Sequence, residues 1–211
     1  MTQPGNDTFD RIAAPYDRGM APLEKIWLRE MRSKLLPLAH GEVLEIGVGT
    51  GANIPFYHPS VRLTAVDESA DMLGFAAQRA QALKRRVRFS QSDVENLNFP
   101  AGCFDTIVAS LVLCSVVSQQ RALGELKRVL KAPTGQLLLL EHMRPHHAGL
   151  ARLSDLANIP WYAFNGRCHL NRETEQNLVE AGFLVERVDS KLGGLLRLIT
   201  ATSIKAGMPA F

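Results

Sequence analysis

The residues best suited to chemistry in this chain form a short apolar run that breaks into alternating glycines. Residues 43–51 read VLEIGVGTG, and an apolar run of this kind favours a buried strand. Glycine has no Cβ, so the backbone after the strand can turn sharply and come close to a bound molecule. Glu45 adds a carboxylate at the same place. The stretch therefore predicts a strand followed by a ligand-binding turn.

The glycines alone leave the ligand open between NAD and another adenosine cofactor. Gly47, Gly49 and Ala52 satisfy the GxGxxG/A pattern of a dinucleotide-binding turn. Asp67 follows at about the spacing expected for a carboxylate that binds a ribose. Both classes of cofactor fit these residues.

Acidic residues at the ends of the following strands favour one of the two classes. Predicted strands at 61–66 and 87–91 lead directly to Asp67 and Asp93. In an open α/β sheet the carboxyl ends of the strands meet at the ligand. A cofactor without phosphate can use one carboxylate for its amino acid end, one for its ribose and one for its adenine. The charge balance therefore favours S-adenosylmethionine over NAD.

Strands and helices alternate along most of the chain, which predicts a parallel sheet with helices on both faces. Residues 142–171 break this regularity, and we expect them to be irregular or to hold a short helix near 150–156. Only Gly193-Gly194 separates the last two strands, which is too short for a crossover helix, so these strands are predicted to be antiparallel. The expected strands are 43–46, 61–66, 87–91, 104–109, 136–141, 183–188 and 195–204; the expected helices are 22–38, 69–84, 119–130 and 172–181.

Five motifs in the same order and spacing resemble a known family. Together they are similar to class I S-adenosylmethionine-dependent methyltransferases of the type 11 group, over nearly the whole chain from Phe9. The resemblance implies a Rossmann-like α/β fold with seven strands in the order 3-2-1-4-5-7-6 and an antiparallel last strand. The motifs are residues 45–51, 66–73, 92–100, 104–108 and 126–131.

The resemblance also implies how the donor end of the cofactor is held. Gly47, Gly49 and Gly51 would admit the cofactor, and Glu45 would orient its methionyl amino group. Tyr16, in a segment like the family's amino-terminal lid, would close over the sulfonium.

Matching positions imply the contacts of the nucleoside and of the methionine chain. Asp67 would accept hydrogen bonds from both ribose hydroxyls, with Met72 near the adenine. Asp93 and the Val94 backbone would bind the adenine edge. Ser110 and Leu111 would flank the methionine moiety.

The candidate base for the methyl acceptor is His142, directly after the fifth predicted strand. A histidine that titrates near neutrality suits the deprotonation of a thiol or phenol; a structural histidine bonded to a loop carbonyl is the alternative. His146, His147, Cys168 and His169 lie nearby in the sequence, but their spacing matches no recognisable zinc pattern. No metal is therefore predicted.

Further motifs at 110–116, 140–142 and 166–174 resemble the subgroup of methyltransferase-like thiol S-methyltransferases. Residues 9–17 also resemble quinone-biosynthesis and phospholipid N-methyltransferases. The expected acceptor is a small, hydrophobic or lipid-like molecule, with a thiol, a quinol or phenol, or a lipid headgroup as the nucleophile. An NAD-dependent oxidoreductase and a non-catalytic S-adenosylmethionine-binding protein remain the alternatives.

Composition sets the remaining expectations. With 211 residues and 46% hydrophobic content, one core domain at 41–211 is expected, with a substrate-side insertion at 142–171 and a helical lid segment at 1–40. The net charge of +3 is scattered, which disfavours nucleic acid. Three cysteines without a CxxC pair indicate reduced thiols and a cytoplasmic location. No run reaches about 18 apolar residues, so no membrane span is expected, although peripheral contact stays open. A monomer or a homodimer is expected.

Overall fold

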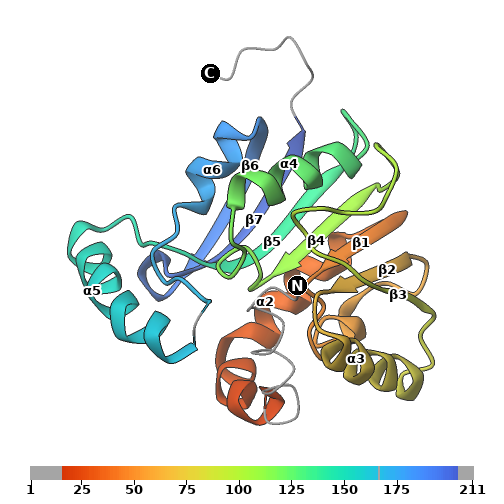
Figure 1. Cartoon of the computed structure of the whole chain (residues 1–211), viewed down its shortest axis with the longest axis horizontal. Coiled ribbons are helices and arrows are strands. Elements are labelled where there is room, and N and C mark those ends of the chain that lie inside the picture. The colour runs from red at the N-terminus through yellow and green to blue at the C-terminus, as the bar shows by residue number, and fades with distance from the viewer. Residues whose placement is uncertain (1–15, 166, 204–211) are drawn as a thin grey trace, which may run out of the picture.

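The computed structural model describes residues 16–165 and 167–203. In these ranges one sheet has the strand order β3-β2-β1-β4-β5-β7-β6, and β7 alone runs antiparallel to its neighbours (Figure 1). This arrangement confirms the expected α/β fold. The strands are β1 (Glu42–Ile46), β2 (Arg62–Asp67), β3 (Val87–Gln91), β4 (Thr106–Ser110), β5 (Gln136–His142), β6 (Phe183–Lys191) and β7 (Leu196–Ser203).

Helices cover both faces of the sheet, and successive residues of a strand point to different faces. On β1, Val43 packs in the cluster that contains the residues of α2 and α3. Leu44 and Ile46 pack in the other cluster, with residues of α4 and α6. Both faces of the strand are therefore buried, which explains its continuous apolar character. The helices are α2 (Arg29–Leu35), α3 (Ala70–Ala82), α4 (Gln119–Val129) and α6 (Thr174–Glu180).

The start of α3 is fixed by a side-chain cap. Ser69 has an extended backbone, and its hydroxyl accepts a hydrogen bond from Met72 N at 3.1 Å. Such a cap satisfies an amide at the helix start that has no partner within the helix. Because the helix begins three residues beyond Asp67, that carboxylate stays in the turn at the carboxyl end of β2.

One face of the amino-terminal segment packs against the sheet. Residues 16–23 are α-helical and run through a π-helical turn (Glu24–Leu28) into α2. Leu28, Met31 and Leu35 are buried in the core. Tyr16 is the first described residue of this segment, and residues 1–15 of the proposed lid lie outside the described part of the chain.

The expectation for the region after β5 is wrong in one respect. Instead of an irregular segment with a short helix, α5 spans Ala148–Asn165 and continues through Pro160. Its apolar residues misled the sequence interpretation, because Leu153, Leu156 and Ile159 are 62–70% exposed and belong to no core face.

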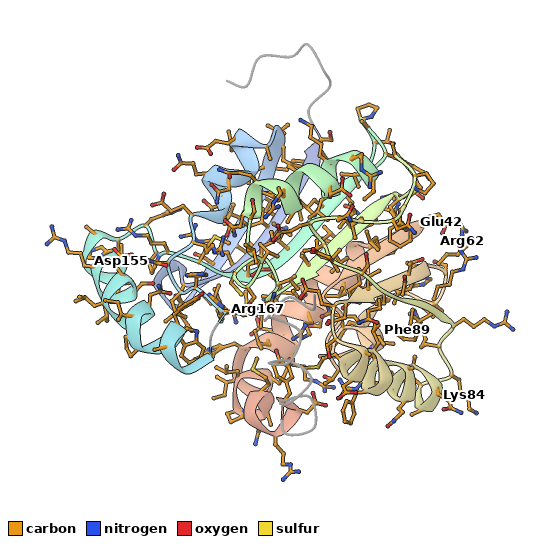
Figure 2. All side chains as sticks on the ribbon, viewed as in Figure 1. Glu42, Arg62, Lys84, Phe89, Asp155 and Arg167 are labelled. Carbon is orange, nitrogen blue, oxygen red and sulfur yellow. The ribbon has the colours of Figure 1, made fainter. Side chains whose placement is uncertain are left out.

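An ion pair holds α5 to the chain that follows β5. Arg144 Nη2 lies 2.9 Å from Asp155 Oδ2. Figure 2 shows Asp155 on the side of the molecule opposite Arg62 and Lys84, with Arg167 nearer the middle. The region 142–171 therefore covers one end of the fold.

The short connection between β6 and β7 makes the hairpin that the sequence predicts. Gly193 and Gly194 have φ values of 64° and 92°, which an L-residue rarely adopts. The antiparallel β7 is the feature that argues against an NAD-dependent oxidoreductase. None of the helices in the described ranges has the length and apolar character needed to cross a bilayer.

Candidate active site

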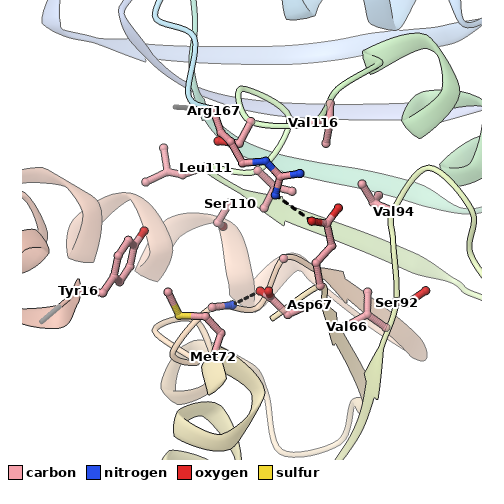
Figure 3. A pocket seen from close by; sticks show the side chains of 15 residues that line it. Tyr16, Val66, Asp67, Met72, Ser92, Val94, Ser110, Leu111, Val116 and Arg167 are labelled. Carbon is pink, nitrogen blue, oxygen red and sulfur yellow. Dashed lines mark hydrogen bonds and ion pairs between the residues drawn. The ribbon is translucent and has the colours of Figure 1, made fainter. Parts of the chain in front are cut away.

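A cavity opens at the carboxyl ends of the parallel strands, where the sequence predicts the cofactor (Figure 3). Most of the predicted binding residues line this cavity. The exceptions are Glu45, Gly51 and Asp93. The lining residues are Tyr16, Gly47, Gly49, Val66, Asp67, Glu68, Met72, Ser92, Val94, Ser110, Leu111, Val112, Ser115, Val116 and Arg167.

The three glycines of the turn have different roles. All have positive φ, between 54° and 81°. A Cβ on Gly47 would lie 2.4 Å from a methyl carbon of Val112, and one on Gly51 would lie 2.7 Å from Ile54 Cδ1. A Cβ on Gly49 would have no atom within 4 Å. Gly47 and Gly51 therefore allow close packing of the protein, whereas Gly49 leaves open space beside the cavity.

The carboxylate of Asp67 connects two turns at the cavity. Its Oδ2 accepts a hydrogen bond from Gly49 N at 2.8 Å, and its Oδ1 accepts one from Ser69 N at 3.0 Å. A carboxylate offers about four acceptor positions. The two backbone contacts therefore fix the orientation of this carboxylate at the cavity wall.

Glu45 lies in a buried network rather than in the wall of the cavity. Its two oxygens accept hydrogen bonds from Asn53 Nδ2 and Tyr57 Oη, both at 2.8 Å. Burial raises the pKa of Glu45 to about 7, although these two hydrogen bonds and the charge of Arg32 lower it. Asn53 also donates to Ser110 Oγ at 3.0 Å, and Ser110 lines the cavity. Glu45 is thus connected to the cavity through Asn53.

Asp93 shapes the loop that carries its lining neighbours. Its Oδ1 accepts a hydrogen bond from Glu95 N at 2.8 Å, and the side chain is exposed. Ser92 and Val94, on either side, line the cavity. A role of Asp93 at the adenine therefore remains a proposal.

The loop after β4 forms the opposite wall and is held by a buried carboxylate. Glu141 Oε1 accepts hydrogen bonds from Val112 N at 2.7 Å and Leu113 N at 2.8 Å. Leu111 has a φ of 59°, a left-handed conformation that is strained for a residue with a Cβ. The strain lies at the cavity wall, where it turns the chain out of the strand.

Tyr16 contributes a neutral phenol. Burial raises its pKa to about 12, against the opposing charge of Arg32. At neutral pH Tyr16 therefore presents a hydrogen-bond donor to the cavity that it lines.

The predicted base, His142, is paired with a cysteine and does not itself line the cavity. Its Nε2 lies 3.0 Å from Cys168 Sγ, which in turn lies 3.8 Å from Cys114 Sγ. The hydrogen bond with Cys114 and the contact with His142 together lower the pKa of Cys168 to about 4, although burial raises it. Burial lowers the pKa of His142, but the contact with Cys168 outweighs it, so the pKa is raised.

An ion pair that the sequence does not predict crosses the cavity. Arg167 Nη1 lies 2.8 Å from Glu68 Oε2, and both residues line the site (Figure 3). The partners are 99 positions apart, so no local pattern could have indicated the contact. Ser115 and Val116 were likewise missed as lining residues, although they belong to a stretch that the family resemblance includes.

Comparisons with known proteins identify the family. A model described as a methyltransferase domain matches residues 44–139. Human thiol S-methyltransferase TMT1A is 31% identical over 82% of this chain and 72% of its own length. The chain belongs to the S-adenosylmethionine-dependent methyltransferase family. When bound, this cofactor supplies an electrophilic methyl group on a sulfonium. The open space at Gly49 and the carboxylate of Asp67 at the cavity wall fit it.

Other relatives within the family differ in their acceptors. Thiol S-methyltransferase TMT1B of Rattus norvegicus is 36% identical over 67% of this chain. The matched part spans 59% of the length of that relative. The ubiquinone/menaquinone biosynthesis C-methyltransferase UbiE of Syntrophotalea carbinolica is 32% identical over 72% of this chain and 68% of its own.

Solved structures share the fold at low identity. Geranyl diphosphate C-methyltransferase from Streptomyces coelicolor, solved with S-adenosyl-L-homocysteine, has a TM-score of 0.69 at 15% identity and covers 84% of this chain and 80% of its own. An S-adenosylmethionine-dependent methyltransferase from Thermotoga maritima reaches 0.71 at 21% identity, over 94% and 99%.

Proposed function

We propose that this chain transfers the methyl group of S-adenosylmethionine to the sulfur of a small apolar thiol. Thiol S-methyltransferases from rat and human are among the relatives, at 31–36% identity. Family membership supports methyl transfer as the reaction class. The choice of a thiol as the acceptor needs support from the site itself.

The observation that carries this choice is the position of Cys114, His142 and Cys168 beside the cavity. Ser115 and Arg167, the chain neighbours of the two cysteines, line the cavity. The adjoining wall contains Leu111, Val112 and Val116 and is apolar. An apolar wall next to a polarizable group of two sulfurs and an imidazole suits a small acceptor whose nucleophile is itself a sulfur.

Methyl transfer from a sulfonium is an in-line displacement with a neutral thioether as the leaving group. The protein mainly has to align the acceptor and the donor and to exclude water, and alignment of this kind can supply about 7–11 kcal/mol. Asp67 and the glycine turn would hold the donor, and the apolar wall would hold the acceptor. A thiol reacts as its thiolate, and we assign to His142 the task of favouring that form.

The test is turnover of S-adenosylmethionine with a panel of acceptors, measured as S-adenosylhomocysteine formed. We expect small apolar thiols to be methylated, and matched phenols and quinols to react at least tenfold more slowly. A preference for phenols, quinols or phosphatidylethanolamine would show that the proposed acceptor is wrong. Calorimetric titration with S-adenosylmethionine and with NAD separates loss of the donor site from choice of a wrong acceptor. Donor binding without turnover on any acceptor would instead support the non-catalytic alternative.

A lipid-like acceptor is the second candidate, because α5 exposes an apolar row. Leu153, Leu156 and Ile159 are 62–70% exposed, on the segment that leads to Arg167 at the cavity. A phosphatidylethanolamine N-methyltransferase of Cereibacter sphaeroides is 34% identical over 53% of this chain and 55% of its own length. Turnover on phosphatidylethanolamine vesicles that falls on Leu156→Ser would favour this candidate over the thiol.

A further inference from the structure

Three side chains with metal-binding atoms meet beside the cavity, although they come from separate segments. Cys114 lies in the loop after β4, His142 is the last residue of β5, and Cys168 lies between α5 and α6. One ligand atom from each lies within 4.8 Å of the other two. In the described ranges this is the sole such group of three or more His, Cys, Asp or Glu residues.

Hydrogen bonds that do not involve the sulfurs hold the two cysteine loops together. His169 N donates to Cys114 O at 3.0 Å, which joins the two loops directly beside both cysteines. Arg172 donates from Nη2 to Val116 O at 2.6 Å. Glu141 holds the start of the β4 loop through two amides. The three ligand atoms are therefore positioned by the fold itself.

The separations suit a tetrahedral ion with sulfur and nitrogen ligands. With Zn–S bonds of about 2.3 Å, two thiolates on a tetrahedron lie about 3.8 Å apart. Cys114 Sγ and Cys168 Sγ are 3.8 Å apart. His142 Nε2 lies 3.0 Å from Cys168 Sγ, about 0.5 Å closer than the matching edge, which a side-chain rotation can open.

The two ring nitrogens of His142 have different surroundings, because Nε2 faces Cys168 Sγ at 3.0 Å and Nδ1 does not. Nδ1 of His142 is buried and has no hydrogen-bond partner among the described residues. A buried polar nitrogen without a partner costs free energy. A cation bound between the two sulfurs and His142 would use Nε2, and Nδ1 would then carry the ring proton.

We propose that Cys114, His142 and Cys168 form a Zn²⁺ site with one coordination position left for an exogenous ligand. Two thiolates and an imidazole are ligands that Zn²⁺ prefers, and three protein ligands with an open fourth position are typical of reactive zinc sites. The chain neighbours Ser115 and Arg167 line the cavity, so the fourth ligand would come from that side.

The role of the fourth position rests on the proposed function. An acceptor thiol that binds there releases its proton to solvent and stays on the metal as a thiolate. Its sulfur then forms a bond to the methyl carbon while the bond from that carbon to the sulfonium sulfur breaks, and neutral S-adenosylhomocysteine leaves. The thioether product carries no charge and binds zinc more weakly than a thiolate, which favours its release.

The test uses the full chain and Zn²⁺ alone, by equilibrium dialysis followed by elemental analysis. We expect one zinc per chain in the unaltered protein, and at least a tenfold loss of affinity in Cys114→Ser, Cys168→Ser and His142→Gln. Cys103→Ser is the matched control, because this third cysteine lies outside the cluster; it should keep one zinc. Circular dichroism and S-adenosylmethionine affinity check that each variant is folded. Replacement of zinc by Co²⁺ should give thiolate-to-cobalt absorption that the cluster variants lack.

Each further result decides the proposal. Less than a tenth of a zinc per chain at micromolar Zn²⁺, or equal loss in Cys103→Ser, overturns it. A disulfide between Cys114 and Cys168 that forms again when the freshly reduced protein is exposed to air also overturns the proposal. It would be detected as an intact mass lower by two hydrogens. Zinc bound at this site without thiol turnover supports the metal site and contradicts the proposed acceptor. Thiol turnover by a zinc-free chain supports the proposed acceptor and contradicts the proposed metal site.

Discussion

The carboxylate of Asp67 accepts a hydrogen bond from Gly49 N at 2.8 Å, so the turn after β2 holds the turn after β1. Because a second backbone amide, Ser69 N, binds its other oxygen, the side chain has one well-defined orientation. Asp67 therefore both shapes the glycine turn and presents acceptors to the cavity.

Replacement of Asp67 by Ala should weaken S-adenosylmethionine binding at least tenfold. Hydrogen bonds to a charged group contribute about 1.5–3 kcal/mol each, and the variant removes the acceptors proposed for the ribose. Isothermal titration gives the affinity, and Asp71→Ala, an exposed acidic residue on the first turn of α3, is the control. Unchanged affinity in Asp67→Ala would falsify the proposed ribose contact.

Gly47→Ala and Gly49→Ala should impair the protein in different ways. Both put a Cβ on a backbone with positive φ, at about 1–2 kcal/mol, but only Gly47→Ala also forces a methyl group against Val112. We expect Gly47→Ala to lower the free energy of unfolding more, and Gly49→Ala to weaken the cofactor more than the fold. Urea unfolding and cofactor titration measure the two effects.

A second substitution separates the clash from the backbone strain. Val112→Ala removes the methyl carbons that a Cβ at position 47 would meet. It should therefore restore part of the stability of Gly47→Ala and none of that of Gly49→Ala. Equal effects of Val112→Ala in both backgrounds would show that packing does not distinguish the two glycines.

The parts of the site that the sequence predicts are those with a local signal. The Asp67 position follows from a strand, an acidic residue and a capping serine within a few residues. The glycine turn and Ser110 are marked in the same way, because each lies where an apolar strand ends. Each of these signals can be read from the sequence because strand, turn and helix cap follow one another within a few residues.

The parts that the sequence does not predict depend on contacts between distant segments. His142 and Cys168 meet across 26 positions, and no ligand spacing could reveal the third member, Cys114. Glu45 is correctly placed in β1, but both faces of that strand are buried, so the pattern could not show that Asn53 and Tyr57 would take its oxygens.

Burial of Glu45 should make stability depend on pH. The pKa is raised from 4.5 to about 7, so between these values the folded chain holds a proton that the unfolded chain lacks. The stabilising effect is complete below pH 4.5 and is lost as the pH rises through 7. Its full size is about 3 kcal/mol, from 1.36 kcal/mol per pKa unit.

Glu45→Gln should flatten this dependence, because the amide does not titrate. Urea unfolding from pH 5 to pH 8 should show the unaltered chain losing stability relative to the variant as the pH rises. Glu186→Gln, which removes an exposed carboxylate on β6, should run parallel to the unaltered chain. If the curve of Glu45→Gln also runs parallel, Glu45 ionises at the same pH in the folded and unfolded states.

The Arg167–Glu68 pair should slow the release of the cofactor more than it stabilises the fold. Its side chains are 18% and 34% exposed, and ion pairs near solvent contribute at most about 1 kcal/mol to folding. Both residues line the cavity, however, so we expect their contact to impede the exit of a bound ligand. We therefore expect Arg167→Gln to raise the dissociation rate of S-adenosylmethionine about three- to tenfold with little change in the melting temperature.

A double-mutant cycle isolates the pair from other contacts of Arg167. Glu68→Gln and the double variant should match the single Arg167→Gln in dissociation rate, because one broken contact explains all three. Arg187→Gln is the control, since its ion pair with Asp189 lies on β6 and belongs to no lining of the cavity. Strictly additive effects of the two substitutions in stopped-flow measurements would mean that the residues act on the cofactor independently, and that the contact between them does not hold it in place.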